Sequence, residues 1–292
     1  MGHKAGFVNI IGNPNVGKST LMNALVGEKL SITTSKAQTT RHRILGIVND
    51  EDYQIVFSDL PGVITPHYKL QEKMMKFIDS AMKDADVFLY MVEVGEKKYN
   101  ENIVEQIKES GIPVVVIINK IDLSKQDVVE VQMRYWEEIF NKSAVIPVSA
   151  LMNFNTEKVL NTIVELLPEN PPYYPKDELT DKSMRFFISE IIREKILLFY
   201  KQEVPYSVEV AVDSYKEDEK IIRIAAWIFV TRESQKMIII GKGGRAIKRV
   251  GIEARKDIEA FVGKHVHLEL SVKVVKDWRD NERQLKRFGY EE

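Results

Sequence analysis

The sequence predicts an α/β domain with a mostly parallel sheet and helices on both faces, followed by a smaller α+β domain. Short apolar runs alternate with amphipathic stretches through the first part of the chain, which is typical of a parallel sheet with two buried faces. A segment with four prolines interrupts this alternation, and the order then changes to helix, two strands, two helices and a strand. We place the first domain at residues 1–170, a proline-rich linker at 171–182, the second domain at 183–276 and a basic tail at 277–292.

Apolar runs rich in β-branched residues predict the strands of the first domain, at residues 6–11, 53–58, 87–92, 114–118 and 144–148. A further short strand at residues 45–48 should form a hairpin with the run that starts at residue 53. Amphipathic periodicity predicts helices between these strands, at residues 70–83 and 102–109.

The second domain has a different order of elements. Strands are expected at residues 207–212, 221–230 and 267–275. Helices are expected at residues 184–200, 234–240 and 245–261. This order predicts a three-stranded sheet with its helices grouped around it.

Composition excludes several classes of protein. No apolar run approaches the roughly 18 residues of a membrane span, and the N-terminal residues lack the pattern of a cleavable signal. The sequence has no cysteine, which excludes disulfides and thiolate metal sites. We therefore expect a cytoplasmic protein.

Charge is distributed unevenly along the chain, although the net charge is only −1. The first domain has an acidic excess, whereas residues 232–287 carry 15 Lys and Arg against 8 Asp and Glu. Such a basic region is suited to holding nucleic acid, although a solvated helix face would have a similar composition.

The first phosphate-binding motif is GNPNVGKST, which satisfies G-x-x-x-x-G-K-[ST] between a predicted strand and a predicted helix. Its glycines let backbone N–H groups converge on phosphates. The Lys18 ammonium would reach the β- and γ-phosphates, and the Ser19 hydroxyl would bind Mg²⁺. The residues expected to contact the nucleotide are Gly12, Asn13, Pro14, Asn15, Val16, Gly17, Lys18, Ser19 and Thr20.

Three further motifs follow predicted strands, in an order that suits a guanine-nucleotide site. Asp59-Leu60-Pro61-Gly62 offers a carboxylate for Mg²⁺ and a glycine N–H for the γ-phosphate. Asn119-Lys120-Ile121-Asp122 offers a carboxylate that can accept the two N–H groups of guanine N1 and N2, a donor pair that adenine lacks. Ser149-Ala150 ends the next strand, where a backbone N–H can meet guanine O6. Asp122 therefore favours GTP over ATP.

Across residues 5–167 the sequence resembles the translation-factor-related class of small GTP-binding proteins. Thr39-Thr40-Arg41 matches the first switch of that class. The resemblance implies that Thr40 binds Mg²⁺ together with Ser19 and Asp59, with Thr39 as the alternative ligand. It also implies GTP hydrolysis in which Lys18, Thr40 and Gly62 act at the phosphates.

Val63 follows Gly62, at a position where many GTPases carry a glutamine that orients the attacking water. Valine cannot hydrogen-bond a water, so either intrinsic hydrolysis is slow or another group orients the water. In similar proteins an asparagine at the position of Asn15 helps to hold a K⁺ ion beside the phosphates. The alternative is that Asn15 only shapes the loop.

The second phosphate-binding motif is Gly241-Lys242-Gly243-Gly244, between two predicted helices. In this context the second domain resembles a type II KH RNA-binding domain, whose extra helix and strand lie on the N-terminal side. The resemblance implies that the loop clamps the backbone of about four unpaired nucleotides. Lys242 is not followed by Ser or Thr, so no Mg²⁺ ligand completes a second P-loop. The cations expected to contact phosphate are Lys242, Arg245, Lys248 and Arg249.

A P-loop domain, a linker with the sequence PPYYP and a terminal KH domain together resemble the Era family of GTPases over nearly the whole chain. The resemblance implies GTP or GDP with Mg²⁺ as ligands. It also implies binding to the 30S subunit near the 3′ end of 16S ribosomal RNA, and a role in maturation of the small subunit. We expect a monomer and leave open a peripheral contact with the inner face of the cell membrane.

Two other functions compete with this interpretation. A nucleotide-gated RNA-binding scaffold with little turnover would be compatible with Val63. An ATP-dependent RNA enzyme would conflict with Asp122, and the sequence lacks helicase motifs.

Overall fold

The strands of the first sheet run mostly in parallel, as the alternating pattern predicts. The structure is a computed structural model that describes residues 2–96, 98–141 and 143–290. Its contacts divide the chain into two units, one made of residues up to Pro66 with Met74–Asp181, and the other made of His67–Lys73 with the chain from Lys182 onward.

Six strands form the sheet of the first unit, in the order β2-β3-β1-β4-β5-β6. Only the β2–β3 pair is antiparallel, which confirms the hairpin predicted from the sequence. The strands are β1 (Lys4–Ile11), β2 (Ile44–Asn49), β3 (Tyr53–Asp59), β4 (Val87–Glu93), β5 (Val114–Asn119) and β6 (Ala144–Pro147). The parallel strands end at one edge of the sheet, which brings the loops that follow β1, β3, β5 and β6 together.

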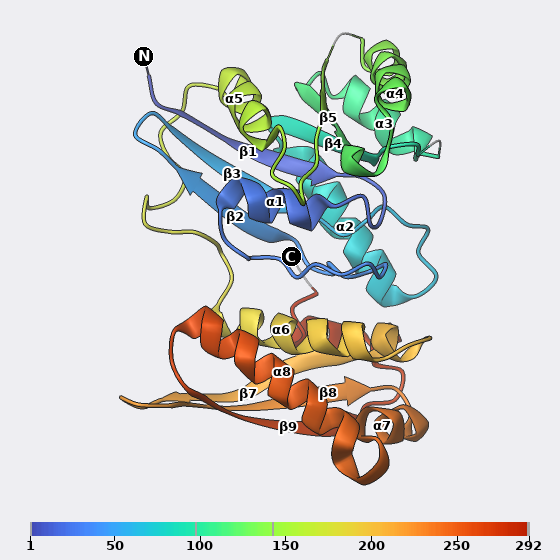
Figure 1. The fold of residues 1–292 in the computed structure, drawn as a ribbon, viewed down its shortest axis with the longest axis vertical. Coiled ribbons are helices and arrows are strands. Elements are labelled where there is room, and N and C mark those ends of the chain that lie inside the picture. The colour runs from blue at the N-terminus through green and yellow to red at the C-terminus, as the bar shows by residue number, and fades with distance from the viewer. Residues whose placement is uncertain (1, 97, 142, 291–292) are drawn as a thin grey trace. The chain divides into compact units, whose positions relative to one another are not determined.

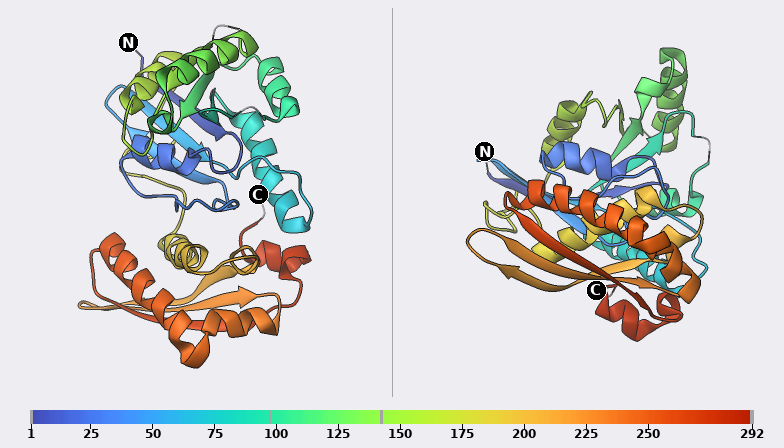
Figure 2. Two further views of the ribbon diagram at one scale, coloured as in Figure 1. Left: turned by 45° about the vertical axis from the view of Figure 1, so that its right-hand side comes forward. Right: turned by 60° about the horizontal axis from the view of Figure 1, so that its bottom comes forward.

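Helices cover both faces of this sheet (Figures 1 and 2). They are α1 (Lys18–Val26), α2 (Lys69–Asp84), α3 (Glu101–Glu109), α4 (Gln126–Ile139) and α5 (Thr156–Leu166), with a 3₁₀ turn, η1 (Ile121–Leu123). Apolar strands packed between two helical layers give a continuous core, and the central residues of β4 and β5 are fully buried. The predicted α/β fold class is therefore confirmed.

The linker segment, which we define as residues 171–181, is held against the first unit. Leu179 accepts a backbone hydrogen bond from the Ile47 N–H at 2.9 Å. The Asp181 carboxylate accepts from the Leu45 N–H at 3.2 Å, and Gln54 exchanges side-chain hydrogen bonds with the backbone of Tyr174. The predicted linker therefore makes hydrogen bonds with both strands of the β2–β3 hairpin.

The second unit is an α+β fold with a three-stranded sheet in the order β7-β8-β9. Its strands are β7 (Glu209–Glu217), β8 (Ile222–Val230) and β9 (Val266–Val274), with β7–β8 antiparallel and β8–β9 parallel. Its helices are α6 (Met184–Phe199), α7 (Glu233–Ile240) and α8 (Arg245–Val262). One apolar core joins these helices to one face of the sheet, and α6 and α8 lie side by side over the strands (Figure 1).

Strand β7 begins two residues later than predicted and continues to Glu217. Pro205 has no backbone N–H, and it lies in the 3₁₀ turn η2 (Val204–Ser207) instead of in a strand ladder.

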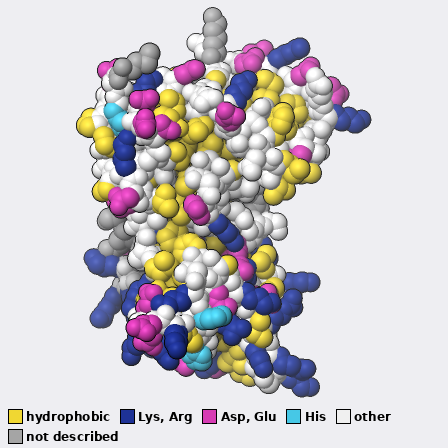
Figure 3. Space-filling view, turned by 60° about the vertical axis from the view of Figure 1, so that its left-hand side comes forward, with side chains coloured by type: hydrophobic (Ala, Val, Ile, Leu, Met, Phe, Trp, Pro, Cys, Tyr) yellow, Lys and Arg dark blue, Asp and Glu magenta, His cyan; other side chains and the backbone are white. Residues whose placement is uncertain are grey.

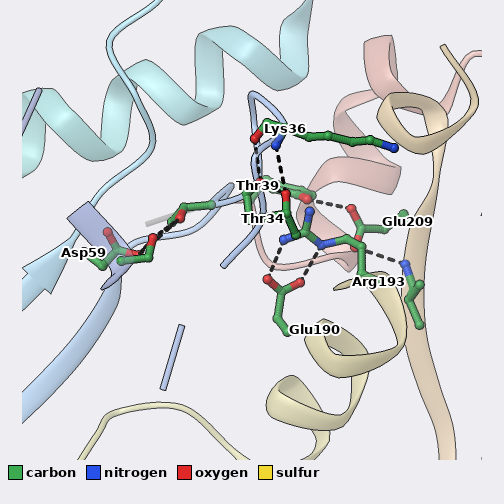
Figure 4. A network of polar contacts seen from close by, with 11 residues as sticks. Thr34, Lys36, Thr39, Asp59, Glu190, Arg193 and Glu209 are labelled. Carbon is green, nitrogen blue, oxygen red and sulfur yellow. Dashed lines mark hydrogen bonds and ion pairs between the residues drawn. The ribbon is translucent and has the colours of Figure 1, made fainter. Parts of the chain in front are cut away.

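Within α6, Arg193 is buried and its Nε donates to Glu190 Oε1 at 2.7 Å, a pair shown in Figure 4. Pairing of this kind lets a helix carry charge into a buried position.

The expected basic tail is folded. It contains the 3₁₀ turn η4 (Trp278–Asp280) and the helix α9 (Glu282–Arg287). Trp278 is completely buried and its Nε1–H donates to the Ser207 carbonyl at 3.0 Å. The Phe288 ring lies 5.0 Å from the ring of Phe229, which alternates to the sheet face opposite the helices. One side of the tail therefore covers part of the second face of the sheet, while its cations Arg283, Lys286 and Arg287 are exposed.

No helix of the described residues is both long enough and apolar enough to cross a bilayer.

Candidate functional site

The GNPNVGKST loop joins β1 to α1, and two of its glycines are required by their surroundings. A Cβ on Gly12 would lie 2.2 Å from the Met91 carbonyl oxygen. Gly17 has a φ of 102°, and a Cβ there would lie 2.3 Å from the amide nitrogen of Asn119. Asn15 is exposed and has a φ of 67°, in a region that asparagine tolerates better than most residues. The left-handed turn at Asn15 thus gives this residue a conformational role in the loop.

The Lys18 side chain is buried against the GNPNVGKST loop, which we call the P-loop. Its Nζ donates to the carbonyls of Gly12 at 3.0 Å and Asn13 at 2.9 Å. Burial lowers the pKa of Lys18 to about 8, although the nearby carboxylates of Asp59 and Glu96 act in the opposite direction. The ammonium is therefore placed at the P-loop in an environment that favours an added negative charge.

Ser19, Thr40 and Asp59 meet at the start of α1. Ser19 Oγ donates to Asp59 Oδ2 at 2.7 Å and lies 2.9 Å from Thr40 Oγ1, which is itself 3.1 Å from Asp59 Oδ2 (Figure 4 shows Asp59). Thr39 points elsewhere, because its hydroxyl donates to the Lys36 carbonyl at 2.6 Å. Of the two candidate threonines, the structure brings Thr40 to the other two oxygen ligands.

These three side chains fit a Mg²⁺ ion. Asp59 is fully buried, and its second carboxylate oxygen, Oδ1, has no hydrogen-bond partner among the described residues. Burial raises the pKa of this carboxyl, while Ser19, Lys18 and Thr40 lower it. Two hydroxyls and one carboxylate are hard oxygen ligands, and a divalent cation would satisfy the unpartnered oxygen and the buried charge.

A cavity of about 550 Å³ opens beside this cluster. The P-loop, the segment from Ile32 to Thr40, Gly62, Lys120 and Leu151 line it. Its volume falls within the range of about 300–1,000 Å³ that is usual for ligand pockets. The structure therefore gathers the predicted phosphate and magnesium residues around one cavity that could hold a nucleotide.

The segment after β3 approaches the P-loop closely. A Cβ on Gly62 would lie 2.7 Å from Pro14, so only glycine fits without displacement of the loop. The Val63 N–H donates to the Gly12 carbonyl at 3.2 Å, while Leu60 and Pro61 are buried. Val63 contributes an apolar side chain to this end of the loop, in keeping with the expectation that it cannot orient a water.

Asn119 connects the P-loop to the loop after β6. Its amide donates to the Val16 carbonyl at 2.8 Å, and its side-chain oxygen accepts from the Ala150 N–H at 3.0 Å. The Ser149 N–H donates to the Phe154 carbonyl at 3.3 Å. We expected a backbone N–H of Ser149-Ala150 to meet guanine O6, and in this arrangement both N–H groups are already engaged.

The Ser149 side chain has a role that sequence reasoning missed. Its Oγ donates to Asp122 Oδ1 at 2.5 Å and so orients the carboxylate that is expected to recognise the base. Lys120 has a φ of 64°, and its ammonium lies 2.6 Å from the Glu93 carboxylate. Ile121 and Asp122 lie in the 3₁₀ turn η1, which directs Asp122 toward solvent.

Glu93 and Glu96 are the other residues that sequence reasoning missed. They lie at the end of β4, where Glu96 Oε1 accepts from the Asn13 amide at 2.6 Å and Glu93 pairs with Lys120. The signal available in the sequence was a pair of acidic residues three apart at the end of a predicted strand. That signal is weak, because acidic residues are common where strands give way to loops.

In the second unit, the Gly241-Lys242-Gly243-Gly244 loop joins α7 to α8. Its three glycines have φ values of 71°, 60° and 74°, all in the region that favours glycine. A Cβ on Gly241 would lie 2.6 Å from the Ala246 Cβ, whereas a Cβ on Gly243 would meet nothing within 4 Å. The loop is therefore closed toward α8 and open on its outer side at Gly243, where another molecule can approach the backbone.

A groove of about 350 Å³ lies next to this loop, between α8 and β9. Lys248 and Arg255 supply cations and His267 an imidazole, and apolar side chains such as Ile252 form the rest of the lining. Gly251 also lines the groove, so its missing side chain leaves room between helix and strand. Lys and Arg side chains are numerous on the face of the second unit that Figure 3 shows, with acidic side chains among them. The sequence predicted Lys248 here and missed the other members.

The predicted cations of this loop do not all reach the groove. Arg245 is exposed, and its Nε donates to the Lys242 carbonyl at 3.3 Å. The Arg249 guanidinium instead lies 4.3 Å from the centre of the Phe199 ring on α6, and Arg249 is not among the groove residues. Arg249 is nevertheless exposed, and its contact with phosphate stays a prediction.

Both parts of the chain match models of known protein families. A family model described as a 50S ribosome-binding GTPase matches residues 7–120, and a KH domain model matches residues 203–279. A GTPase Era from Caldanaerobacter subterraneus is 46% identical over 294 residues, covering 99% of both chains. A GTPase Era from Clostridium kluyveri is 45% identical over 292 residues, covering 98% of this chain and 99% of the relative.

Two solved structures match the fold over nearly its full length. One is a crystal structure of Era in complex with MgGDPNP and nucleotides 1506–1542 of 16S ribosomal RNA, with 38% identity, a TM-score of 0.94 and 99% coverage of both chains. The other is an Aquifex aeolicus Era variant bound to GDP and AlF₄⁻, also with 38% identity and a TM-score of 0.94, covering 98% of this chain and 99% of the other.

The buried Lys18 should make stability depend on alkaline pH when no nucleotide is bound. Its pKa is about 8 in the folded chain and 10.5 ordinarily, so unfolding takes up a proton between these values. Stability must rise with pH in that window, because the unfolded state binds more protons. Relative to Lys18→Met, the free energy of unfolding should rise by roughly 2 kcal/mol from pH 8 to pH 10. Denaturant titrations at both pH values measure this, with exposed Lys158→Met as the control. Parallel curves for the parent and Lys18→Met would contradict the burial argument.

The Ser149–Asp122 contact should contribute to recognition of the base. Ser149→Ala removes the oriented donor and should weaken GDP binding by at least about tenfold, because a hydrogen bond to a charged group contributes about 1.5–3 kcal/mol. Asp122→Asn should shift preference from guanine to xanthine nucleotides, because the amide can donate to the xanthine O2. Displacement of a fluorescent GDP by GDP and by XDP reports both effects. Unchanged GDP affinity in Asp122→Asn would remove Asp122 from base recognition.

Proposed function

The chain belongs to the GTPase Era family, and from that premise we propose that it is an RNA-binding GTPase switch that acts in maturation of the small ribosomal subunit. It is a GTP-hydrolysing enzyme. The finer proposal is that GTP binding and hydrolysis in the first unit control binding of 16S ribosomal RNA near its 3′ end by the second unit. We propose residues 1–170 for the GTP-binding domain, 171–182 for the linker, 183–276 for the RNA-binding domain and 277–292 for a tail.

The observation that carries this proposal is the presence of two phosphate-binding loops with different chemistry. In the P-loop, Lys18 is followed by Ser19, whose hydroxyl lies 2.7 Å from Asp59 and 2.9 Å from Thr40. In the glycine loop of the second unit, Lys242 is followed by Gly243, which offers no oxygen ligand for a metal. One loop therefore suits a nucleotide with Mg²⁺, and the other suits a phosphodiester backbone.

At the nucleotide, each residue has a proposed task that follows from its placement. Lys18 holds the β- and γ-phosphates, and the Gly62 N–H contacts the γ-phosphate. Ser19, Thr40 and Asp59 would hold Mg²⁺, which when bound would neutralise charge on the phosphates. Release of the γ-phosphate would remove the contact that Gly62 makes with it and would weaken the hold of Mg²⁺ on Thr40, and a rearrangement of these two segments is the proposed switch.

At the RNA, the glycine loop would hold the backbone while the adjoining groove receives bases. Gly243 and Gly244 leave the outer side of the loop free of side chains, and Lys242 and Lys248 supply charge there. Apolar and aromatic surfaces accept unstacked bases of single-stranded RNA. The relative at 0.94 TM-score that was crystallised with nucleotides of 16S ribosomal RNA supports that target.

Charge reversal in the glycine loop tests the RNA site. Replacing Lys242 and Gly243 by aspartate should abolish binding of single-stranded ribosomal RNA ends, because the new carboxylates meet the phosphate backbone. GTP affinity and basal hydrolysis should stay unchanged, since Ser19 and its partners are untouched. Fluorescence titration with RNA, beside a GTP-binding assay on the same protein, measures both. Lys201→Asp, an exposed lysine outside the loop and the groove, is the control and should cause a far smaller loss. RNA affinity that survives while GTP binding falls would place the loop in the nucleotide site.

A cation effect tests how hydrolysis proceeds without a glutamine at Val63. If Asn15 and K⁺ supply the missing positive charge, hydrolysis should run at least about tenfold faster in K⁺ than in Na⁺ at equal ionic strength. An arginine finger, which also supplies positive charge, accelerates hydrolysis by about 10³ to 10⁵. Asn15→Ala should remove that difference. Equal steady-state rates in the two salts would leave Asn15 with a loop-shaping role only.

The second candidate function is a slowly hydrolysing, nucleotide-gated RNA scaffold, and the apolar Val63 at the P-loop favours it. Steady-state turnover with and without RNA separates the two functions. Stimulation of turnover by RNA supports the GTPase switch, and turnover that stays slow in RNA and in K⁺ supports the scaffold.

A further inference from the structure

An apolar pocket lies on the first unit beside α4, and neither the nucleotide nor the RNA function uses it. It has a volume of about 400 Å³ and is lined by Gly95, Glu96, Val128, Val131, Gln132 and Tyr135. Three of these residues expose large apolar side chains, with 67% of Val131, 43% of Tyr135 and 40% of Val128 accessible. None of the six lines the GTP-binding cavity.

The core does not need this apolar face of α4. The helix packs inward through Val129, Gln132 and Trp136, which are buried. Val128, Val131 and Tyr135 follow the spacing i, i+3 and i+7, so they form a second apolar stripe beside the first. A helix that only packs on its own sheet requires one stripe, and contiguous exposed apolar side chains often mark an interaction site.

The surroundings of this pocket are acidic. Glu96 lines it, and on α4 Asp127 and Glu138 stand four residues before and seven residues after Val131, which places them on the same side of the helix. The Tyr135 hydroxyl, burial and the charges of Glu101 and Glu105 all raise the pKa of the Tyr99 hydroxyl beside this stripe. The cations of this region are Lys125, just before α4, and Arg134, whereas α4 carries the acidic residues Asp127, Glu130, Glu137 and Glu138, so negative charge predominates along the helix.

We propose that this pocket docks a segment of another protein in which one or two large apolar side chains are flanked by lysine or arginine. The apolar stripe would bury the large side chains, and the acidic rim would select the basic flanks. Charge complementarity of this kind determines which partners bind and how fast they associate. A helix with apolar residues four apart would match the spacing along α4.

The floor of the pocket is bonded to the nucleotide site, so we infer that docking changes nucleotide release. The Gln132 side chain accepts from the Gly95 N–H at 2.7 Å and donates to the Glu93 carbonyl at 3.1 Å. From this turn, Glu96 holds the P-loop residue Asn13 and Glu93 holds Lys120. This coupling rests on the proposed nucleotide function, whereas docking itself does not.

A synthetic peptide tests the docking. The probe is a helical peptide of about 14 residues with two leucines four positions apart and lysines elsewhere on the same face. Binding to the full chain is followed by fluorescence anisotropy, without nucleotide and with GDP. Val131→Asp places a charge in the pocket on a mostly exposed residue and should weaken binding by at least about tenfold. Leu166→Asp, an exposed apolar residue on α5, is the matched control and should leave binding unchanged.

Charge and coupling have their own variants. Glu138→Lys should weaken the lysine peptide and strengthen a matched glutamate peptide. Glu93→Gln lies outside the pocket lining and weakens the contact with Lys120, so it should keep peptide binding and remove the effect of the peptide on the release rate of fluorescent GDP. A peptide that binds without changing GDP release in the parent protein would overturn the coupling and leave docking supported.

Three results would overturn docking itself. They are equal binding of lysine and glutamate peptides, binding unaffected by Val131→Asp, and self-association of the chain that Val131→Asp abolishes, which would make a second copy the occupant. Failure of the proposed GTPase function would appear separately, as absent GDP binding in the parent protein with peptide binding intact.

Discussion

The buried amide of Asn119 is the interaction on which the arrangement of the nucleotide site depends. Its two ends bind the backbone on opposite sides, at Val16 in the P-loop and at Ala150 after β6. These loops follow different strands, β1 and β6. The Asn119 side chain is hydrogen-bonded to both loops and so fixes the distance between them. Gly17 must lack a side chain because the same amide lies where a Cβ would be. Glycine in the motif is thus required by a neighbour in the protein as well as by the phosphates.

Burial disfavours the charged forms of Lys18 and Asp59 when no ligand compensates for it. Burial shifts the pKa of Lys18 downward and that of Asp59 upward, so each group is pushed toward its neutral form. A nucleotide with Mg²⁺ would bring negative charge to the ammonium and positive charge to the carboxylate, and both shifts would be relieved together. Shifted pKa values of this kind are common at functional sites, where ligand binding can offset the unfavourable burial of charge.

Sequence reasoning predicted the fold class and most elements, because strand and helix periodicity and the glycine motifs are local features. It placed the helix before the second glycine loop within one residue of α7. It missed contacts that depend on tertiary structure, such as Ser149 with Asp122 and the burial of Trp278. The local sequence around Trp278 is basic and polar, and nothing in it shows that Ser207 lies opposite. The groove between α8 and β9 was missed for the same reason, since its two walls come from separate elements.

The segment along β2 has a consequence for how the first unit resists aggregation. β2 is one of the two edge strands of the six-stranded sheet, and an unpaired edge strand presents N–H and C=O groups to which a second chain can add. Here the Ile47 N–H is occupied by the Leu179 carbonyl and the Leu45 N–H by Asp181. Cutting the chain at residue 170 would uncover these donors and offer a template for intermolecular strand pairing. The smallest piece that keeps its sheet protected therefore extends to Asp181, although the proline-rich stretch looks dispensable in the sequence.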